Sequence, residues 1–97
     1  MLKILAEVCF LPENEGGMTR DAFSGLMVSF NVNGDLIMCK IILGEEKEKK
    51  IILRGEKNIV DIELPYGEMY KDLIIPYYVF TLNVGKRVIA NGIVLKV

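Results

Sequence analysis

Few side chains in this sequence have the types and spacing that catalysis requires. The chain contains no histidine, so no serine, cysteine or lysine has the usual general base available to it. Asp61 and Glu63 lie two positions apart in a strand-like segment and would share its outer face. Solvated carboxylates do not form an acid–base pair, because one of the two must sit in an apolar pocket. We therefore expect no catalytic residue and a protein that is not an enzyme.

Sites for a nucleotide, a metal or another cofactor are not expected either. Glu15, Gly16 and Gly17 lack the Gly-Lys-Ser/Thr ending of a phosphate loop, and no helical segment follows them. With no histidine and only two cysteines, the usual zinc ligands are missing. Cys9 and Cys39 lie in apolar runs, which favours two buried free thiols over the alternative of a disulfide.

The bulk composition indicates one folded domain without a strong electrostatic preference. The chain has 97 residues, of which 52% are hydrophobic. Its 12 basic and 13 acidic residues give a net charge of −1, which argues against a bulk nucleic-acid binder but is compatible with a local basic patch. No apolar run approaches the roughly 20 residues of a membrane span, and residues 1–5 are too short for a signal peptide. We expect a cytoplasmic protein with no membrane partner.

Short segments of alternating apolar and polar residues predict an all-β fold. Two are joined by Asn33-Gly34, the dipeptide typical of a type I′ hairpin turn. No segment has a helical period of ten residues or more, so six or seven short strands indicate a small barrel or sandwich. The expected strands cover residues 2–11, 25–32, 36–43, 51–53, 59–64, 78–84 and 88–97.

The last two of these strands form the hairpin around which the fold is expected to close. Its turn is predicted at Gly85-Lys86, and Gly92 in the returning strand indicates a bulge or a close backbone approach. Strict alternation would place one set of side chains inward, namely Tyr78, Phe80, Leu82 and Val84. The other parity, which includes Asn83, would face outward.

The connections between the strands leave several interpretations open. Residues 13–21 form a polar loop that is either functional or a simple connector. The mixed-charge run 44–50 favours a solvated connector over a docking loop. Residues 51–53 are expected to be an unpaired edge, which would allow strand-mediated dimers. The remaining candidates are tyrosines that either stack on a partner or cover a barrel end, Tyr66, Tyr70 and Tyr77.

Three segments, in order and at matching spacing, resemble the C-terminal β-barrel domain, the third domain, of bacterial elongation factor Tu. The first is Glu15-Gly16-Gly17 followed by Phe23-Ser24-Gly25, similar to the family's acidic Gly-Gly loop and aromatic-x-Gly motif. The second, residues 53–59 with Leu64-Pro65, resembles a Pro-Gly-Asp turn and the strand after it. The third, residues 80–97, is similar to the family's ending. The resemblance implies a six-stranded antiparallel barrel of Greek-key type, standing alone as one domain over residues 1–97.

In that family the barrel contacts the T-stem of aminoacyl-tRNA and packs on a GTPase domain, but this chain departs from the RNA-contacting pattern. Met18 replaces the arginine after the Gly-Gly pair, and residues 26–29 replace the Tyr-Arg-Pro-Gln segment. Met38 stands at a threonine position implicated in RNA contact. Methionine offers an RNA phosphate neither a cation nor a hydroxyl donor. Met18, Met27 and Met38 would then either form an adaptable apolar patch for a protein or fill a barrel end.

We therefore predict a non-catalytic binding module related to translation, with a protein partner favoured. The candidate surface combines the loop of residues 15–21 with the turn at residues 86–87, and its residues are Gly16, Gly17, Met18, Arg20, Lys86 and Arg87. The alternative is binding of tRNA or other RNA through a residual basic patch, Lys40, Lys86, Arg87 and Lys96.

Overall fold

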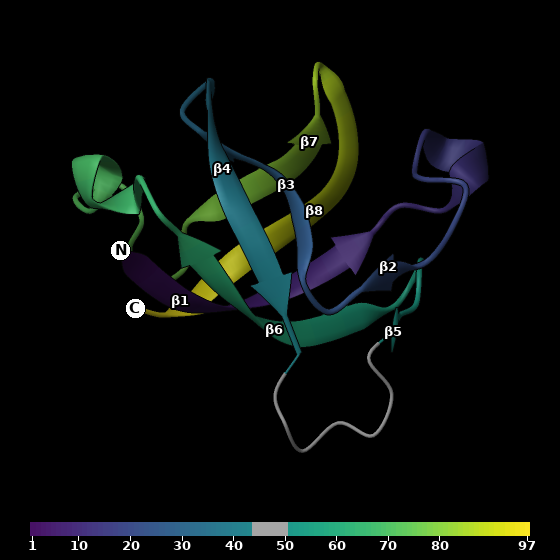
Figure 1. Ribbon diagram of the computed structural model, residues 1–97, viewed down its shortest axis with the longest axis horizontal. Helices are drawn as coiled ribbons and strands as arrows, with labels where there is room; N and C mark the ends of the chain where they lie inside the picture. Colours follow the sequence, from purple (N-terminus) through teal and green to yellow (C-terminus); the bar gives the residue numbers. More distant parts are fainter. Residues whose placement is uncertain (44–50) are drawn as a thin grey trace.

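A computed structural model describes residues 1–43 and 51–97, so the interpretations of the run 44–50 lie outside the described residues. The chain forms a closed antiparallel barrel in which neighbouring strands follow the order β1-β6-β4-β3-β7-β8 (Figure 1). These strands are β1 (Leu2–Phe10), β3 (Leu26–Val32), β4 (Asp35–Ile42), β6 (Lys57–Leu64), β7 (Val79–Val84) and β8 (Arg87–Lys96). The all-β, six-stranded barrel predicted from the sequence is confirmed.

A second, two-stranded sheet lies beside the barrel and was missed in the sequence. In it β2 (Ala22–Phe23) pairs with β5 (Ile51–Ile52), so β5 has a partner on one side and is an edge strand on the other. A strand of two residues has no period to detect, which is why Ala22–Phe23 was assigned to no strand. The remaining elements are two 3-10 turns, η1 (Glu13–Glu15) and η2 (Gly67–Tyr70). Within the described ranges, no helix has the length and apolar character to cross a membrane.

The barrel interior is filled by the apolar side chains on the inward face of each strand. Alternate residues of β1 are fully buried, and in β6 the buried residues are likewise two apart, Val60, Ile62 and Leu64. Inside the barrel, the rings of Phe30 and Phe80 from the neighbouring strands β3 and β7 stack with centroids 4.3 Å apart. Aromatic pairs at this distance add to the free energy gained from burial alone. The buried residues of β1 are Ile4, Ala6, Val8 and Phe10.

Two glycine-dependent predictions are confirmed by the backbone. Asn33 and Gly34 both have positive φ, 50° and 95°, as a type I′ turn requires. The Gly34 N–H also donates to Asn31 Oδ1 at 2.9 Å. At Gly92, an added Cβ would lie 2.6 Å from Phe80 Cζ and 2.8 Å from the Glu7 carbonyl oxygen. The close backbone approach expected there is therefore real, and β1 and β7 both contribute to it.

The burial of two residues at the end of β7 differs from the prediction. Leu82 pairs with Ala90 but Asn83 pairs with Val88, so Ile89 is an extra residue in β8 and the alternation of β8 is broken there. The Thr81 hydroxyl donates to Asn83 Oδ1, so the two side chains share a face and Asn83 keeps its predicted parity. Asn83 is nevertheless only 5% exposed, while Val84, beyond the last residue that pairs with β3, is 50% exposed. The prediction of a solvent-facing Asn83 and a buried Val84 is therefore wrong.

The β3–β4 hairpin joins the rest of the barrel through two short seams. Along β3 and β4 the two strands pair over seven positions. By contrast, β4 pairs with β6 at only three positions, and β3 pairs with β7 at only Ser29, Phe30 and Asn31. The residues of β3 that precede Ser29, Leu26 to Val28, therefore pair with β4 but not with β7. Figure 1 shows the β7–β8 hairpin diverging from the β3–β4 hairpin.

Tyrosines from the segment before β7 hold the tip of the β3–β4 hairpin. The hydroxyl of Tyr78 accepts a hydrogen bond from the Asn33 N–H at 2.9 Å. The hydroxyl of Tyr70 donates to Asp35 Oδ2 at 3.2 Å, and burial of the ring together with the nearby carboxylate raises the pKa of Tyr70. Tyr70 is half-buried against the core, whereas Tyr66 and Tyr77 are exposed. Of the three candidate tyrosines, only Tyr70 packs over the barrel.

Candidate partner-binding surface

The two glycines of the predicted surface shape its loop from within. Gly16 follows η1 with a φ of 92°, a left-handed conformation that glycine adopts without strain. Gly17 is buried, and a Cβ there would lie 1.9 Å from the carbonyl oxygen of Leu11. Its N–H donates to the Pro12 carbonyl at 3.0 Å. Gly17 thus fixes the path of the loop and exposes little of itself to a partner.

Arg54 anchors the rest of this loop to the turn that follows β5. Its backbone N–H and its Nε donate to Asp21 Oδ1 at 3.1 and 3.0 Å, and its Nη1 donates to the Met18 carbonyl at 2.7 Å. The hydrogen bond from the Arg54 backbone, followed by that from its side chain, lowers the pKa of Asp21. Sequence reasoning missed Arg54, because its partners lie more than 30 residues away along the chain.

The opposite wall comes from the β7–β8 hairpin. Its turn at Gly85-Lys86 is where the sequence predicted it, and Arg87 begins β8. Val84 lies beyond the last residue of β7 that pairs with β3, and this apolar side chain is half-exposed beside Arg87. Val84 is therefore a surface residue that the simple alternation of the strand concealed.

A groove of about 400 Å³ separates the two walls. It brings together three of the predicted residues, Met18 and Arg20 from the loop and Arg87 from the hairpin, while Lys86 precedes Arg87 at the turn. Among the described residues, neither Arg20 nor Arg87 forms an ion pair. We call this cavity the arginine groove, and its lining is Met18, Thr19, Arg20, Asp21, Ala22, Phe23, Leu26, Val84 and Arg87.

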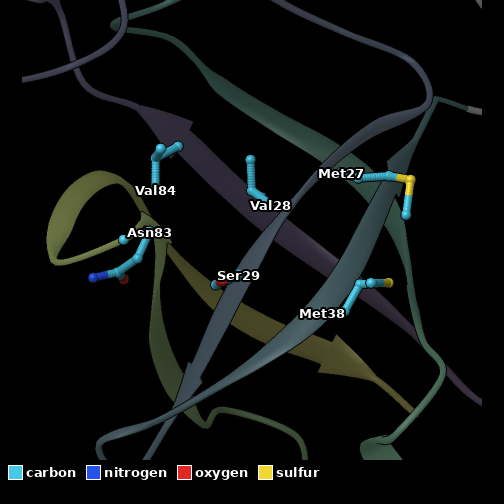
Figure 2. Close-up of a pocket in the computed structure, with 7 residues that line it drawn as sticks. Met27, Val28, Ser29, Met38, Asn83 and Val84 are labelled. Carbon is cyan, nitrogen blue, oxygen red and sulfur yellow. The ribbon is translucent and has the colours of Figure 1, made fainter.

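A second cavity, of about 340 Å³, lies where β3 and β7 separate (Figure 2). Val84 lines both cavities, so they adjoin. Met27 and Met38 project at its edge and are 57% and 46% exposed. Two of the three candidate methionines thus form an exposed apolar patch, while Met18 is half-buried against the core. We call this cavity the β3–β7 cleft, and its lining is Met27, Val28, Ser29, Met38, Asn83, Val84 and Gly85.

The residues of the alternative RNA set do not all lie on one surface. Arg87 begins β8, directly after Lys86, and Lys96 ends the strand nine residues later. At about 3.3 Å per residue the two ends are at most roughly 30 Å apart. Lys40 lies near the end of β4, opposite Met27 of the β3–β7 cleft on one side and Glu63 on the other. Of the four residues, Arg87 alone lines the arginine groove together with Arg20.

The other chemically capable residues are dispersed. Asp61 is exposed on β6, and Glu63 lies 3.6 Å from Lys3 Nζ through its Oε2. Cys9 and Cys39 are free thiols, and burial raises the pKa of Cys39 to about 12. In residues 1–43 and 51–97, no three histidine, cysteine, aspartate or glutamate side chains are grouped to hold a metal ion.

Comparison with known proteins does not assign the chain to a family. No protein-family model matches the chain, and the curated proteins include no significant match to it.

Proposed function

We propose that the chain is a non-catalytic binding module whose partner is a protein, bound at the arginine groove and the adjoining β3–β7 cleft. The observation that supports this most directly is the shared lining of the groove. Loop residues Met18 and Arg20 meet hairpin residue Arg87 around exposed apolar side chains. Phe23 is 54% exposed there, beside the half-exposed Val84. Apolar centres with arginines at their edges are typical of protein interfaces.

Protein is favoured over RNA by the composition of this surface. Nucleic-acid affinity depends on the number of phosphates neutralised by cations. The arginine groove and the turn supply three cations, Arg20, Lys86 and Arg87, and Lys40 lies beside Met27 at the edge of the β3–β7 cleft, while Lys96 lies at the far end of β8. Exposed methionine, valine and phenylalanine add apolar area that phosphate cannot use but that an apolar protein side chain can. RNA binding is the competing outcome of the experiment below.

The resemblance to the third domain of elongation factor Tu belongs to this proposal. A closed six-stranded barrel is the architecture which that resemblance implied. Because one fold carries many functions, the proposal assigns function from the surface residues rather than from the barrel. Within it, the chain is a translation-related module in which a protein-binding surface replaces the tRNA contacts. A cytoplasmic location is included, because free thiols such as Cys9 and Cys39 persist under reducing conditions.

Affinity capture with matched variants tests the proposal. The chain would be used as bait in an extract of the cells that produce it, with and without ribonuclease, beside the variant Arg20→Glu/Arg87→Glu. Lys71→Glu/Lys96→Glu is the control, since it changes the charge equally at exposed lysines outside both cavities. The expected result is a protein that survives ribonuclease, is lost with the arginine variant and is kept with the control.

Two outcomes would contradict the proposal. A partner retained equally by both double variants would place the binding surface elsewhere on the barrel. A salt-sensitive gel shift with tRNA that is abolished by Lys86→Glu/Arg87→Glu and weakened by Lys96→Glu would favour RNA, because each phosphate contact contributes to the salt dependence.

A further inference from the structure

The first half of β3 offers an open strand edge inside the proposed surface. Leu26, Met27 and Val28 pair with Ile41, Lys40 and Cys39 of β4, but the ladder to β7 begins only at Ser29. Leu26 lines the arginine groove, and Met27 and Val28 line the β3–β7 cleft. The open edge therefore runs along both cavities. An unpaired edge of this kind is a template for an added strand.

Asn83 supplies the β3–β7 cleft with an amide at its wall. The Thr81 hydroxyl donates to Asn83 Oδ1 at 2.9 Å, which fixes the orientation of the amide. The residue is only 5% exposed and lines the cleft, and no buried side-chain nitrogen or oxygen in the described residues lacks a partner, so Asn83 Nδ2 is in contact with solvent. Nδ2 is therefore a donor that a carbonyl oxygen of a ligand in the cleft can use (Figure 2).

The charges around the arginine groove define which peptide this edge would take. Arg20 and Arg87 have no ion-pair partner in the described part of the chain. The one carboxylate in the lining, Asp21, is held by Arg54 at 3.0 Å and is not available to them. The uncompensated charge of the groove is therefore positive, and its complement is an acidic ligand.

We infer that the occupant is an extended acidic peptide that adds a strand to the open edge of β3. The inference rests on the proposed function and specifies the partner's chemistry. Backbone groups of the peptide pair along Leu26 to Val28, and one of its carbonyls accepts from Asn83 Nδ2. Apolar side chains contact Met27, Met38 and Val84, and carboxylates pair with Arg20 and Arg87. In an extended peptide these two kinds of side chain alternate along the sequence.

Defined synthetic peptides test this inference without knowledge of the natural partner. The probe is a peptide of about seven residues, a usual strand length, in which valine and glutamate alternate. Its matched control replaces every glutamate by lysine. Fluorescence anisotropy with the intact chain is expected to show at least about tenfold tighter binding of the acidic peptide, as charge complementarity predicts. In Arg20→Glu/Arg87→Glu the preference is expected to reverse.

Backbone pairing is tested separately from charge. Two analogues of the acidic peptide carry N-methyl groups on alternate nitrogens, one set for each strand edge, and at least one of them is expected to lose binding. Asn83→Leu is expected to weaken binding about five- to tenfold, the effect of one hydrogen bond. Urea unfolding of each variant shows that the barrel is intact.

The results separate this inference from the proposed function. Equal affinity for the acidic and basic peptides, or full affinity of both methylated analogues, would overturn strand addition. If no peptide binds although affinity capture finds a protein that depends on Arg20 and Arg87, the strand inference fails and the proposed function stands. If capture also fails to depend on these arginines, both fail.

Discussion

Cys39 is the residue whose ionisation the barrel suppresses most clearly. Its thiol is fully enclosed on β4, and burial raises its pKa to about 12. The thiolate is the reactive form of cysteine. Cys9 is only half-buried, near the end of β1. The two thiols therefore differ in access although both occur in apolar runs of the sequence.

We predict that Cys39 resists thiol reagents in the folded protein at pH 8 and reacts after unfolding. Mass spectrometry after iodoacetamide treatment, with and without urea, measures this at each cysteine. The Cys9→Ser variant isolates the Cys39 signal. Rapid and complete labelling of Cys39 in the native variant would contradict the prediction.

The same burial predicts a stability change at high pH. The folded pKa of Cys39 lies above the value of about 8.5 expected for an unfolded chain. Above about pH 8.5 the unfolded state binds fewer protons than the folded state. The free energy of unfolding therefore falls as the pH rises. We expect the urea midpoint to decline between about pH 8.5 and 11, and to decline less in Cys39→Ala relative to that variant's own value at pH 7. Equal slopes would contradict the prediction.

Gly17 packs so closely against the backbone of Leu11 that it leaves no room for a Cβ atom. We predict that Gly17→Ala destabilises the protein by about 1–3 kcal/mol, because the new methyl group overlaps the backbone of Leu11 and the loop must move. Urea unfolding measures the change. Asn14→Ala, in the exposed η1 turn, is the control and is expected to stay within about 0.5 kcal/mol of the wild type. An unchanged midpoint in Gly17→Ala would show that the loop has room there.

At the scale of elements, the link between the loop and β5 depends on one ion pair. We predict that Arg54→Ala loosens the loop, because three hydrogen bonds to Asp21 and Met18 depend on Arg54 and its removal breaks the two from the side chain. The pKa of Asp21 is lowered, so this contribution is present above about pH 4 and is lost as the pH falls through the folded pKa. Urea unfolding from pH 2 to 7 should therefore show a weaker acid dependence in Arg54→Ala.

Asp21→Asn completes a double-mutant cycle for the same pair. If the ion pair acts as described, the double variant loses less stability than the two single variants together. Strict additivity would mean that Arg54 and Asp21 support the loop independently.

The strands were predictable wherever the alternation of side chains was regular. In β1 and β6 each buried residue follows the period of two, and Asn33-Gly34 fixed its hairpin by local turn chemistry. The bulge at Ile89 was not predictable, because an extra residue is recognised only from the strand that it pairs with. The burial of Asn83 and the exposure of Val84 were not predictable either, because they depend on where the pairing of β3 with β7 ends. Arg54 depends on long-range contacts that no local pattern contains.

The candidate surface was predictable in part. Loop and turn composition placed Met18, Arg20 and Arg87 together, and the structure shows that they line one groove. Lys40 and Lys96 were grouped with Lys86 by charge alone, but the length of β8 separates Lys96 from Lys86, and Lys40 lies in another strand, β4. Distances across a barrel depend on strand order and register, which net charge and motif spacing do not encode.

At the scale of the whole molecule, stability is expected to be uneven around the barrel. We predict that amides of β3 and β4 exchange with deuterium faster than those of β1, because their hairpin is joined at two seams of three pairs each while β1 pairs extensively with β6 and β8. Hydrogen exchange read by NMR, residue by residue, tests this. Uniform protection around the six strands would show that the barrel opens only as a unit.

The short seams have a further consequence at high protein concentration. The closed barrel leaves a short edge of β3 open, but detachment of the β3–β4 hairpin exposes β6 and β7 together with both edges of the hairpin itself. The complementary edges of a second molecule then match these edges in register and sequence. Reciprocal exchange of hairpins would build a domain-swapped dimer in which every native strand pair is retained.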